Sequence, residues 1–295
     1  MRKRAAFTWI LFFTLYCVQA EVPVFTFVAV GDIGCGCDEQ TQVAQRMLEW
    51  HAKHRFNTVV VMGDAIYGKS PEIRGGNRAL FEERFDQYYQ PLLKSGVKFY
   101  VALGNHDVET ENGLHEILDQ ARFHILRREG YYVFSSPQKV DGKPLISFFA
   151  LNSNTLRERG KDLVQVEWLQ RALKEDKSMW KIAYFHHPIH TAGGAHQPEL
   201  VLRERIESVL ADGGINLVLN GHNHFYARMK PRKGVIHITS GGGGRPLYTP
   251  KMSESAAVVR KAHHFLYFEV QPDKLGLSAV QVSGALIDQL TIVRP

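Results

Sequence analysis

A chain of 295 residues is long enough to bury a full hydrophobic core in one large domain or two small ones. Its 44% hydrophobic and 22% charged residues are typical of a soluble globular protein. Arg2, Lys3 and Arg4 account for three of the 36 Lys and Arg, so the chain without them has 33 against 30 Asp and Glu, a net charge of about +3. No basic block or aromatic-interleaved patch stands out, which argues against nucleic-acid binding.

The first twenty residues differ from the rest of the chain. "MRKR" is basic, the apolar run after it is too short to span a bilayer comfortably, and "VQA" places small-enough residues before Glu21. This pattern predicts a signal peptide, residues 1–20, and export to a periplasm or the exterior. No stable membrane anchor is expected after cleavage. An uncleaved anchor is the alternative.

The following segments alternate between buried strands and amphipathic helices. The predicted strands are 24–30, 58–62, 97–103, 145–151, 180–185 and 215–220. The predicted helices are 39–54, 79–93, 162–176 and 199–212. Continuous apolar strands between helices indicate α/β layers with sheets buried on both faces.

The C-terminal part has a different pattern. Its apolar runs 235–240, 264–271, 274–282 and 285–293 alternate with short turns, which is typical of antiparallel hairpins. No Pro/Ser-rich linker, repeat or low-complexity segment divides residues 21–295. We therefore expect one domain, residues 21–295.

Polar residues follow the ends of five predicted strands. They stand in the turns "GDIG" (31–34), "GDAIY" (63–67), "GNHD" (104–107), "HHP" (186–188) and "GHNH" (221–224). Because the carboxyl ends of strands line the ligand crevice of open α/β sheets, we expect these groups to converge.

Each of these turns has a structural explanation when it is taken alone. Asp32 or Asp64 after glycine is a common turn residue or helix cap, and Asn105 suits a left-handed turn. Together, however, the turns supply two aspartates, one asparagine and three histidines. Such a mixture of hard oxygens and imidazoles suits iron, manganese or zinc. The set therefore predicts a metal site.

As a series, the five turns resemble the motifs of the calcineurin-like metallophosphoesterases. The tyrosine at position 67 makes the motif "GDAIY" resemble that of the purple acid phosphatase branch, particularly its small tartrate-resistant-like members. The resemblance covers residues 24–245. It implies an α/β fold, a four-layer α-β-β-α sandwich with two mixed sheets and a metal site at the carboxyl ends of the strands.

The resemblance also implies the ligands of two metal ions. Asp64 would bridge the ions. The other expected ligands are Asp32, Tyr67 and His224 for one ion and Asn105, His186 and His222 for the second. His186 is preferred to His187 because the family's ligand precedes the proline by two residues.

Tyr67 bears on the identity of the metals. A phenolate is held deprotonated only by a strongly acidic ion, so Fe(III) is expected beside Tyr67, with Fe(II), Zn or Mn at the second site. The alternative for Tyr67 is an aromatic side chain packed over the cleft.

This chemistry predicts a binuclear-metal acid phosphatase. Two metal ions would clamp the phosphate of a small-molecule phosphomonoester and present a metal-bound hydroxide as the nucleophile. His106 is expected to be the general acid, since a protonated imidazole can protonate the departing alkoxide. The alternatives are a phosphodiesterase on the same metal core and, in another class, a non-catalytic metal-binding domain.

Two loops and two cysteines complete the sequence-based picture. His196 lies on a glycine-containing loop that resembles the family's substrate-facing loop, and it is expected to bind substrate; an exposed loop histidine is the alternative. "SGGGGRPLY" (240–248) is expected to approach the site closely, with Arg245 as a phosphate contact. The redox state of Cys35 and Cys37 stays open. Export to an oxidising compartment permits a disulfide bond between them, but a spacer of one residue would require a strained local bend.

Overall fold

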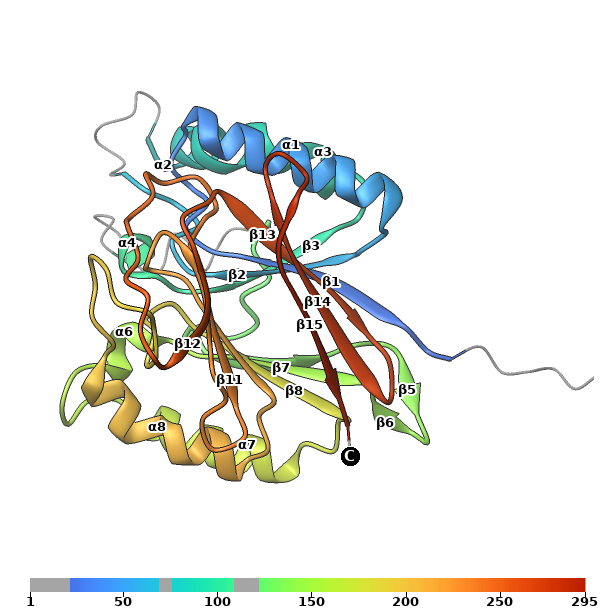
Figure 1. The fold of residues 1–295 in the computed structure, drawn as a ribbon, viewed down its shortest axis with the longest axis vertical. Coiled ribbons are helices and arrows are strands. Elements are labelled where there is room, and N and C mark those ends of the chain that lie inside the picture. Colours follow the sequence, from blue (N-terminus) through green and yellow to red (C-terminus); the bar gives the residue numbers. More distant parts are fainter. Residues whose placement is uncertain (1–21, 69–75, 109–121, 295) are drawn as a thin grey trace, which may run out of the picture.

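The computed structural model describes residues 22–68, 76–108 and 122–294, in which two β-sheets pack between two layers of helices (Figure 1). The predicted signal peptide lies outside these residues. Within the described ranges, no helix combines the length and the apolar character needed to cross a membrane.

The first sheet has the strand order β15-β14-β13-β1-β2-β3. Strands β1, β2 and β3 are parallel, whereas β13, β14 and β15 form an antiparallel meander beside β1. The strands are β1 (Phe25–Val30), β2 (Thr58–Met62), β3 (Lys98–Ala102), β13 (His264–Val270), β14 (Lys274–Gln281) and β15 (Leu286–Val293). The sheet is therefore mixed, and its late strands are the hairpins expected from the sequence.

The second sheet has the order β12-β10-β11-β9-β8-β7-β4 and is also mixed. Its parallel core comprises β7, β8, β9 and β11, and β4 and β10 are antiparallel to their neighbours. The strands are β4 (Tyr132–Ser135), β7 (Ile146–Ala150), β8 (Trp180–Tyr184), β9 (Leu217–Asn220), β10 (Tyr226–Met229), β11 (Ile236–Ser240) and β12 (Ala256–Arg260). A separate two-stranded hairpin pairs β5 (Lys139–Val140) with β6 (Lys143–Pro144).

Helices cover the outer faces of the two sheets (Figure 1). The first sheet carries α1 (Asp38–Lys53) and α3 (Gln87–Lys94), and the second carries α7 (Leu163–Glu175) and α8 (Leu200–Asp212). The other α-helices in the described residues are short: α2 (Gly76–Phe81), α4 (Asn105–Val108) and α6 (Ser153–Leu156).

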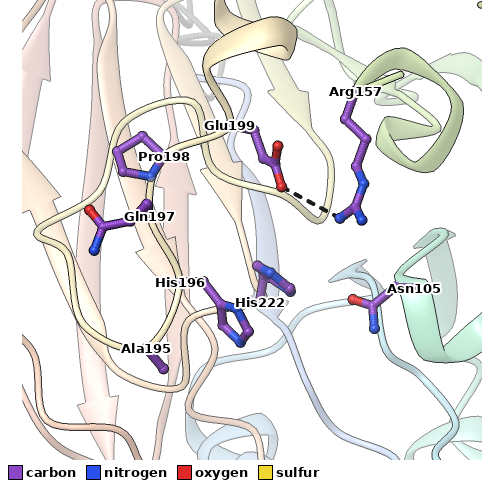
Figure 2. Close-up of a pocket in the computed structure, with 8 residues that line it drawn as sticks. All are labelled: Asn105, Arg157, Ala195, His196, Gln197, Pro198, Glu199 and His222. Atoms are coloured by element: carbon purple, nitrogen blue, oxygen red, sulfur yellow. Dashed lines mark hydrogen bonds and ion pairs between the residues drawn. The ribbon is translucent and has the colours of Figure 1, made fainter. Parts of the chain in front are cut away.

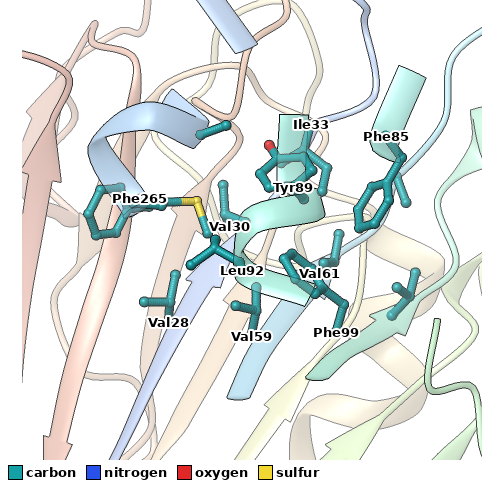
Figure 3. Packing of buried hydrophobic residues seen from close by; sticks show 14 of the residues in the cluster. Val28, Val30, Ile33, Val59, Val61, Phe85, Tyr89, Leu92, Phe99 and Phe265 are labelled. Atoms are coloured by element: carbon teal, nitrogen blue, oxygen red, sulfur yellow. The ribbon is translucent and has the colours of Figure 1, made fainter. Parts of the chain in front are cut away.

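The alternation of side chains along β1 explains the layers. Val28 and Val30 face the helices and join the cluster drawn in Figure 3, whereas Phe27 and Ala29 face the other sheet. The Phe27 ring meets Phe148 of β7 edge-on, with ring centroids 4.8 Å apart. One apolar layer thus lies between the sheets and one under each helical layer, which confirms the four-layer sandwich.

The structure corrects the predicted helix 79–93. The chain forms α2, a π-helical turn (Glu82–Asp86) and α3 instead. At the wider turn the Arg84 carbonyl accepts a hydrogen bond from the Gln40 amide (2.7 Å), and the Arg84 guanidinium donates to the Cys35 carbonyl (2.6 Å). The interruption therefore joins this helical segment to the loop that follows β1.

Candidate metal centre

The predicted ligands meet where the carboxyl ends of both sheets face one another. Asp32, Asp64 and Asn105 follow β1, β2 and β3 of the first sheet. His186 follows β8 and His222 follows β9 of the second sheet. The two sheets thus bring together residues that are scattered over nearly two hundred positions of the sequence.

Three of these residues have a left-handed backbone. The φ angles are 63° at Asp32, 52° at Asp64 and 67° at His222. Few non-glycine residues adopt this conformation, which costs of order 1 kcal/mol or more and persists only where the surroundings enforce it. Its repetition at three strand ends makes this edge of the molecule a candidate functional site.

Glycines next to these residues leave room for the carboxylates. A Cβ atom on Gly104 would lie 2.1 Å from Asp64 Oδ1, and one on Gly221 would lie 2.6 Å from Asp32 Oδ2. Both distances are shorter than any normal contact. The glycine in "GNHD" and that in "GHNH" are therefore required by the packing of the two carboxylates.

Asp32, Tyr67 and His224, which we call the closed half, meet at one oxygen atom. The Tyr67 hydroxyl donates to Asp32 Oδ1 (3.1 Å), and His224 Nε2 lies 3.4 Å from the same oxygen. The other ring nitrogen of His224 donates to the Pro246 carbonyl (3.0 Å), so Nε2 is the nitrogen that faces the carboxylate. Metal-binding histidines are commonly oriented in this way.

Asn105, His186 and His222, which we call the open half, meet around His186 Nε2. This atom lies 3.1 Å from Asn105 Oδ1, 3.1 Å from His222 Nδ1 and 3.3 Å from Asp64 Oδ2. His186 Nδ1 donates to the Met62 carbonyl (2.9 Å), so Nε2 is the ring nitrogen that faces Asn105, His222 and Asp64. An amide oxygen, a carboxylate oxygen and two imidazole nitrogens thus converge.

Asp64 lies between the two halves. Its Oδ2 faces His186, and its Oδ1 accepts the backbone N–H of His106 (3.0 Å). One ligand atom each from Asp64, Asp32 and His186 lie within 4.8 Å of one another. This is the position expected for a carboxylate that bridges two ions.

Burial and neighbouring charges shift the pKa values of three residues of the site. Burial favours the neutral form of the Asp64 carboxyl, but His186 and His106 outweigh it and lower the pKa of Asp64 to about 2. Burial would lower the pKa of His186, yet the facing Asp64 carboxylate raises it to about 9. Burial and then the charges of Asp32 and Asp64 raise the pKa of Tyr67 well above its usual value. Only a strongly acidic cation would therefore hold Tyr67 as a phenolate.

His106 lies on α4 at the edge of the site. Its ring centroid is 4.6 Å from that of Tyr67. Asp107, the next residue, is buried and accepts the backbone N–H groups of Gly104 (2.8 Å) and Ile66 (3.0 Å). Asp107 thus ties the Asp64 turn to the Asn105 turn, a role that the motif "GNHD" does not reveal by itself.

His187 and His196 occupy different positions around His222. His187 is buried, its Nδ1 contacts Ser153 Oγ (2.8 Å), and its Nε2 has no hydrogen-bond partner in the described part of the chain. The His187, His186 and His222 nitrogens also form a possible metal-binding group. The His196 ring lies 4.0 Å from that of His222 and lines a cavity of about 460 Å³ beside the open half (Figure 2).

The Gly-rich loop approaches the site as expected. Gly243 N–H donates to the Gly31 carbonyl (3.0 Å), and a Cβ on Gly241 would lie 2.6 Å from Asp32 Oδ2. The Arg245 guanidinium carbon lies 4.4 Å from the Tyr67 ring centroid, and its buried Nε has no hydrogen-bond partner among the described residues. The loop thus covers the closed half.

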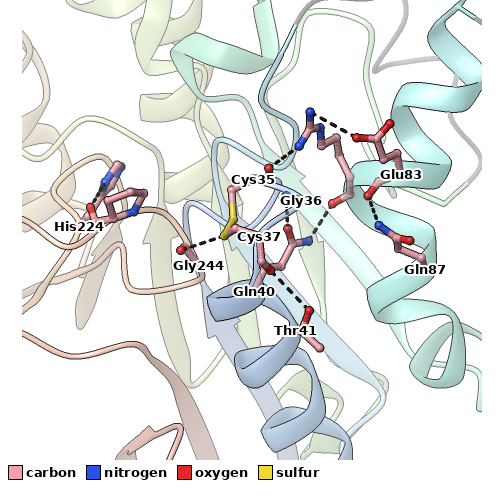
Figure 4. Close-up of a disulfide and its surroundings, with 11 residues drawn as sticks. Cys35, Gly36, Cys37, Gln40, Thr41, Glu83, Gln87, His224 and Gly244 are labelled. Atoms are coloured by element: carbon pink, nitrogen blue, oxygen red, sulfur yellow. Dashed lines mark hydrogen bonds and ion pairs between the residues drawn. A yellow bond between two sulfur atoms is a disulfide. The ribbon is translucent and has the colours of Figure 1, made fainter. Parts of the chain in front are cut away.

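Cys35 and Cys37 form a disulfide, which the sequence left open (Figure 4). The Cα atoms are 5.3 Å apart, and Cys37 Sγ contacts the Gly244 carbonyl oxygen at 3.2 Å. The disulfide lies three to five positions after Asp32, so it fixes the turn that carries this ligand against the Gly-rich loop.

Arg157, which also lines the cavity, was not among the predicted site residues. It stands in no recognisable motif and reaches the site only through the packing of α6. His190, by contrast, points away from the metal centre toward Glu207 (2.6 Å), and His264 is buried against Ser240 Oγ (2.9 Å), as expected for a structural residue.

Comparisons with known proteins agree with this geometry. A family model described as calcineurin-like phosphoesterase matches residues 25–226. Purple acid phosphatase 7 of Arabidopsis thaliana is 26% identical over 243 aligned positions, which cover 75% of this chain and 70% of that protein. Tartrate-resistant acid phosphatase type 5 of Rattus norvegicus is 23% identical over 313 positions, covering 93% and 92%.

Among solved structures, GAP50, "the anchor in the inner membrane complex of Plasmodium", has a similar fold. Its TM-score is 0.78 at 15% identity, and the match covers 92% of this chain and 89% of that chain.

Proposed function

Because the chain belongs to the calcineurin-like phosphoesterase family, we propose that it is a binuclear-metal acid phosphatase that hydrolyses phosphomonoesters. Its purple acid phosphatase relatives support this branch of the family. The observation that carries the proposal is the convergence of buried carboxylate, amide and imidazole atoms around His186 Nε2 and Asp32 Oδ1. Donor atoms of these kinds, gathered at one place, suit iron, zinc or manganese.

The donor sets suit two different ions. The closed half, with its carboxylate and phenol, would hold Fe(III), and the open half, with its amide and two imidazoles, would hold Fe(II), Zn or Mn. Asp64 would contact both ions. When bound, the two ions would neutralise the charge of the phosphate and supply an activated water.

The remaining roles belong to residues of the chain itself. His106 would donate the proton that the departing alkoxide needs, since a positioned imidazole is well suited to general acid catalysis at mildly acidic pH. His196 would contact the substrate from the cavity wall, next to His222. Arg245, whose Nε has no partner within the described ranges, would contact a phosphate oxygen.

We further propose that the substrate is a small molecule and that the mature chain is exported without a membrane anchor or a nucleic-acid partner. The polar cavity of about 460 Å³ supports a small ligand. Export is supported by the pattern of residues 1–20 and is compatible with the disulfide, since oxidising compartments favour disulfide bonds.

Two rival functions share this scaffold. A phosphodiesterase would use the same metal core, and a non-catalytic domain would keep the metals without turnover. The fold likeness to GAP50, which is described as an anchor, gives the second rival its specific support. The complete set of ligands together with His106 favours catalysis.

The test is turnover of p-nitrophenyl phosphate and of bis(p-nitrophenyl) phosphate by metal-loaded protein at mildly acidic pH. We expect a clear preference for the monoester. A preference for the bis ester would support the phosphodiesterase, and no turnover of either substrate with two metals bound would support the non-catalytic domain.

A further inference from the structure

The cavity beside the open half has a charged wall that the phosphate chemistry does not require. Asn105 and His222 form the wall nearest the metal centre, and Arg157 and Glu199 lie opposite with an ion pair between them (Figure 2). A phosphate held at the metal centre would leave the rest of its substrate in this cavity. The charged wall therefore faces the alcohol part of the substrate.

The backbone that carries Arg157 is fixed relative to Asn105. Arg157 follows α6 directly, and the Asn154 amide of α6 donates to the carbonyls of Leu103 and Gly104 (3.2 Å each). These carbonyls belong to the turn that positions Asn105. The backbone at Arg157 is therefore held at a defined place beyond the open half.

Glu199 is fixed in a similar way from the opposite side. It precedes α8, and its backbone N–H donates to the Pro188 carbonyl (2.9 Å). Its carboxylate lies 3.4 Å from the Arg157 guanidinium, and the two side chains are 29% and 40% exposed. A pair of this exposure contributes little stability by itself, so its members are free to exchange partners.

A single charge on the alcohol part would fit this wall poorly. A lone carboxylate would be attracted by Arg157 but repelled by Glu199. A lone ammonium would be attracted by Glu199 but repelled by Arg157. A group with both charges side by side would replace one ion pair by two, carboxylate on guanidinium and ammonium on carboxylate.

We propose that the leaving group is zwitterionic, which makes the preferred substrate class the O-phosphorylated free amino acids. This inference rests on the proposed phosphatase function. Hydrolysis would break the bond between phosphorus and the side-chain oxygen and form a bond from phosphorus to a water oxygen. The leaving oxygen takes its proton from His106, and the products are inorganic phosphate and the free hydroxy-amino acid.

The experiment compares kcat/KM for four phosphomonoesters. O-phospho-L-serine carries both charges, phosphoethanolamine lacks the carboxylate, phosphoglycolate lacks the ammonium, and p-nitrophenyl phosphate lacks both. We expect the native protein to favour O-phospho-L-serine over the two singly charged compounds.

The variants Arg157→Met and Glu199→Gln test the two contacts separately. Removing Arg157 should lower kcat/KM for O-phospho-L-serine about 10- to 100-fold, as expected for a lost charge-assisted hydrogen bond, and lower that for p-nitrophenyl phosphate much less. Glu199→Gln should likewise lower kcat/KM for O-phospho-L-serine and raise kcat/KM for phosphoglycolate.

The matched controls are Arg159→Met and Glu204→Gln. Arg159 and Glu204 form an ion pair of similar length (3.6 Å), but both side chains are more exposed than those of Arg157 and Glu199. Neither control should change the substrate preference.

Two outcomes would overturn the inference. Equal losses of kcat/KM on all four substrates would mean that the ion pair only connects α6 to α8. Equal kcat/KM values for O-phospho-L-serine and phosphoethanolamine would mean that the wall does not recognise the carboxylate. If no phosphomonoester is turned over, the phosphatase proposal fails instead. Calorimetric binding of O-phospho-L-serine to the native protein and to Arg157→Met then decides whether the wall recognises a zwitterion.

Discussion

The closed and open halves of the metal centre lie at the same edge of the fold, yet they differ in donor atoms and in cover. The closed half offers a carboxylate and a phenol, and it is covered by Arg245 and by Tyr248, whose ring stacks on His224 at 4.2 Å. The open half offers neutral donors, and Asn105 and His222 line the cavity. The same edge of the fold thus provides one enclosed position and one that substrate can reach.

The difference between the two halves suits them to different roles. Anionic donors under a cover would retain a ferric ion during turnover, because charge and exclusion of solvent both oppose its release. Neutral donors beside a cavity would leave the second ion with its positive charge available to phosphate. The comparison predicts that substitutions in the two halves have different consequences.

The largest expected effect is in the open half. His222→Ala should remove most of the activity and one metal equivalent, because no other imidazole occupies its place. Metal analysis and turnover measure both effects. His187→Ala is the matched control and should be mild, since His187 Nδ1 contacts Ser153 rather than the ligands. A larger loss in His187→Ala would assign His187 to the metal in place of the expected set.

The second effect concerns the proton rather than the metals. His106→Ala should keep both metals and lower turnover by roughly 10²–10⁴-fold, the usual scale for a lost general acid. Because p-nitrophenolate needs little help to leave, its turnover should fall less than that of an alkyl phosphate. Equal losses would show that His106 only positions the phosphate.

The third effect tests the closed half. Iron-loaded protein should be coloured by charge transfer from the Tyr67 phenolate, and Tyr67→Phe should bleach the visible band while retaining most of the bound metal. A colourless native protein, or a band that the substitution does not change, would leave Tyr67 as an aromatic packed over the cleft.

The smallest expected effect concerns His237, which lies outside both halves, and it changes the stability of the fold rather than catalysis. Burial and then His190 lower the pKa of His237 to about 3. The unfolded chain therefore binds a proton that the folded chain does not, and this histidine costs stability as the pH falls from about 6.5 toward 3. The expected slope is about 1.4 kcal/mol per pH unit.

Urea denaturation between pH 6.5 and pH 4 measures this slope. His237→Phe should weaken the pH dependence without changing the metal content. The prediction is wrong if both proteins lose stability in parallel.

The strand ends were predictable because each ligand follows a strong local signal, an apolar strand and a glycine. The same signals identified the family, and the comparisons confirm it. Strands β4, β10 and β12 escaped prediction because none of them has a long continuous apolar run. β4 and β12 lie at the edges of their sheet, and Arg228 interrupts the short strand β10.

What could not be predicted depends on contacts distant in sequence. The break in the helix at Arg84 reflects hydrogen bonds to Gln40 and Cys35, about fifty residues away. Arg157 reaches the cavity only because Asn154 binds the turn at Gly104. No local pattern records such contacts.

The glycines that border the carboxylates also affect how loss of function would look in a relative of this protein. An alanine at position 104 would place its methyl group where Asp64 Oδ1 now lies, although every donor residue would still be present in the sequence. A chain that keeps all seven ligands can therefore be inactive. Whether a homologue is a phosphatase has to be judged from the positions without side chains as well as from those that bear the donors.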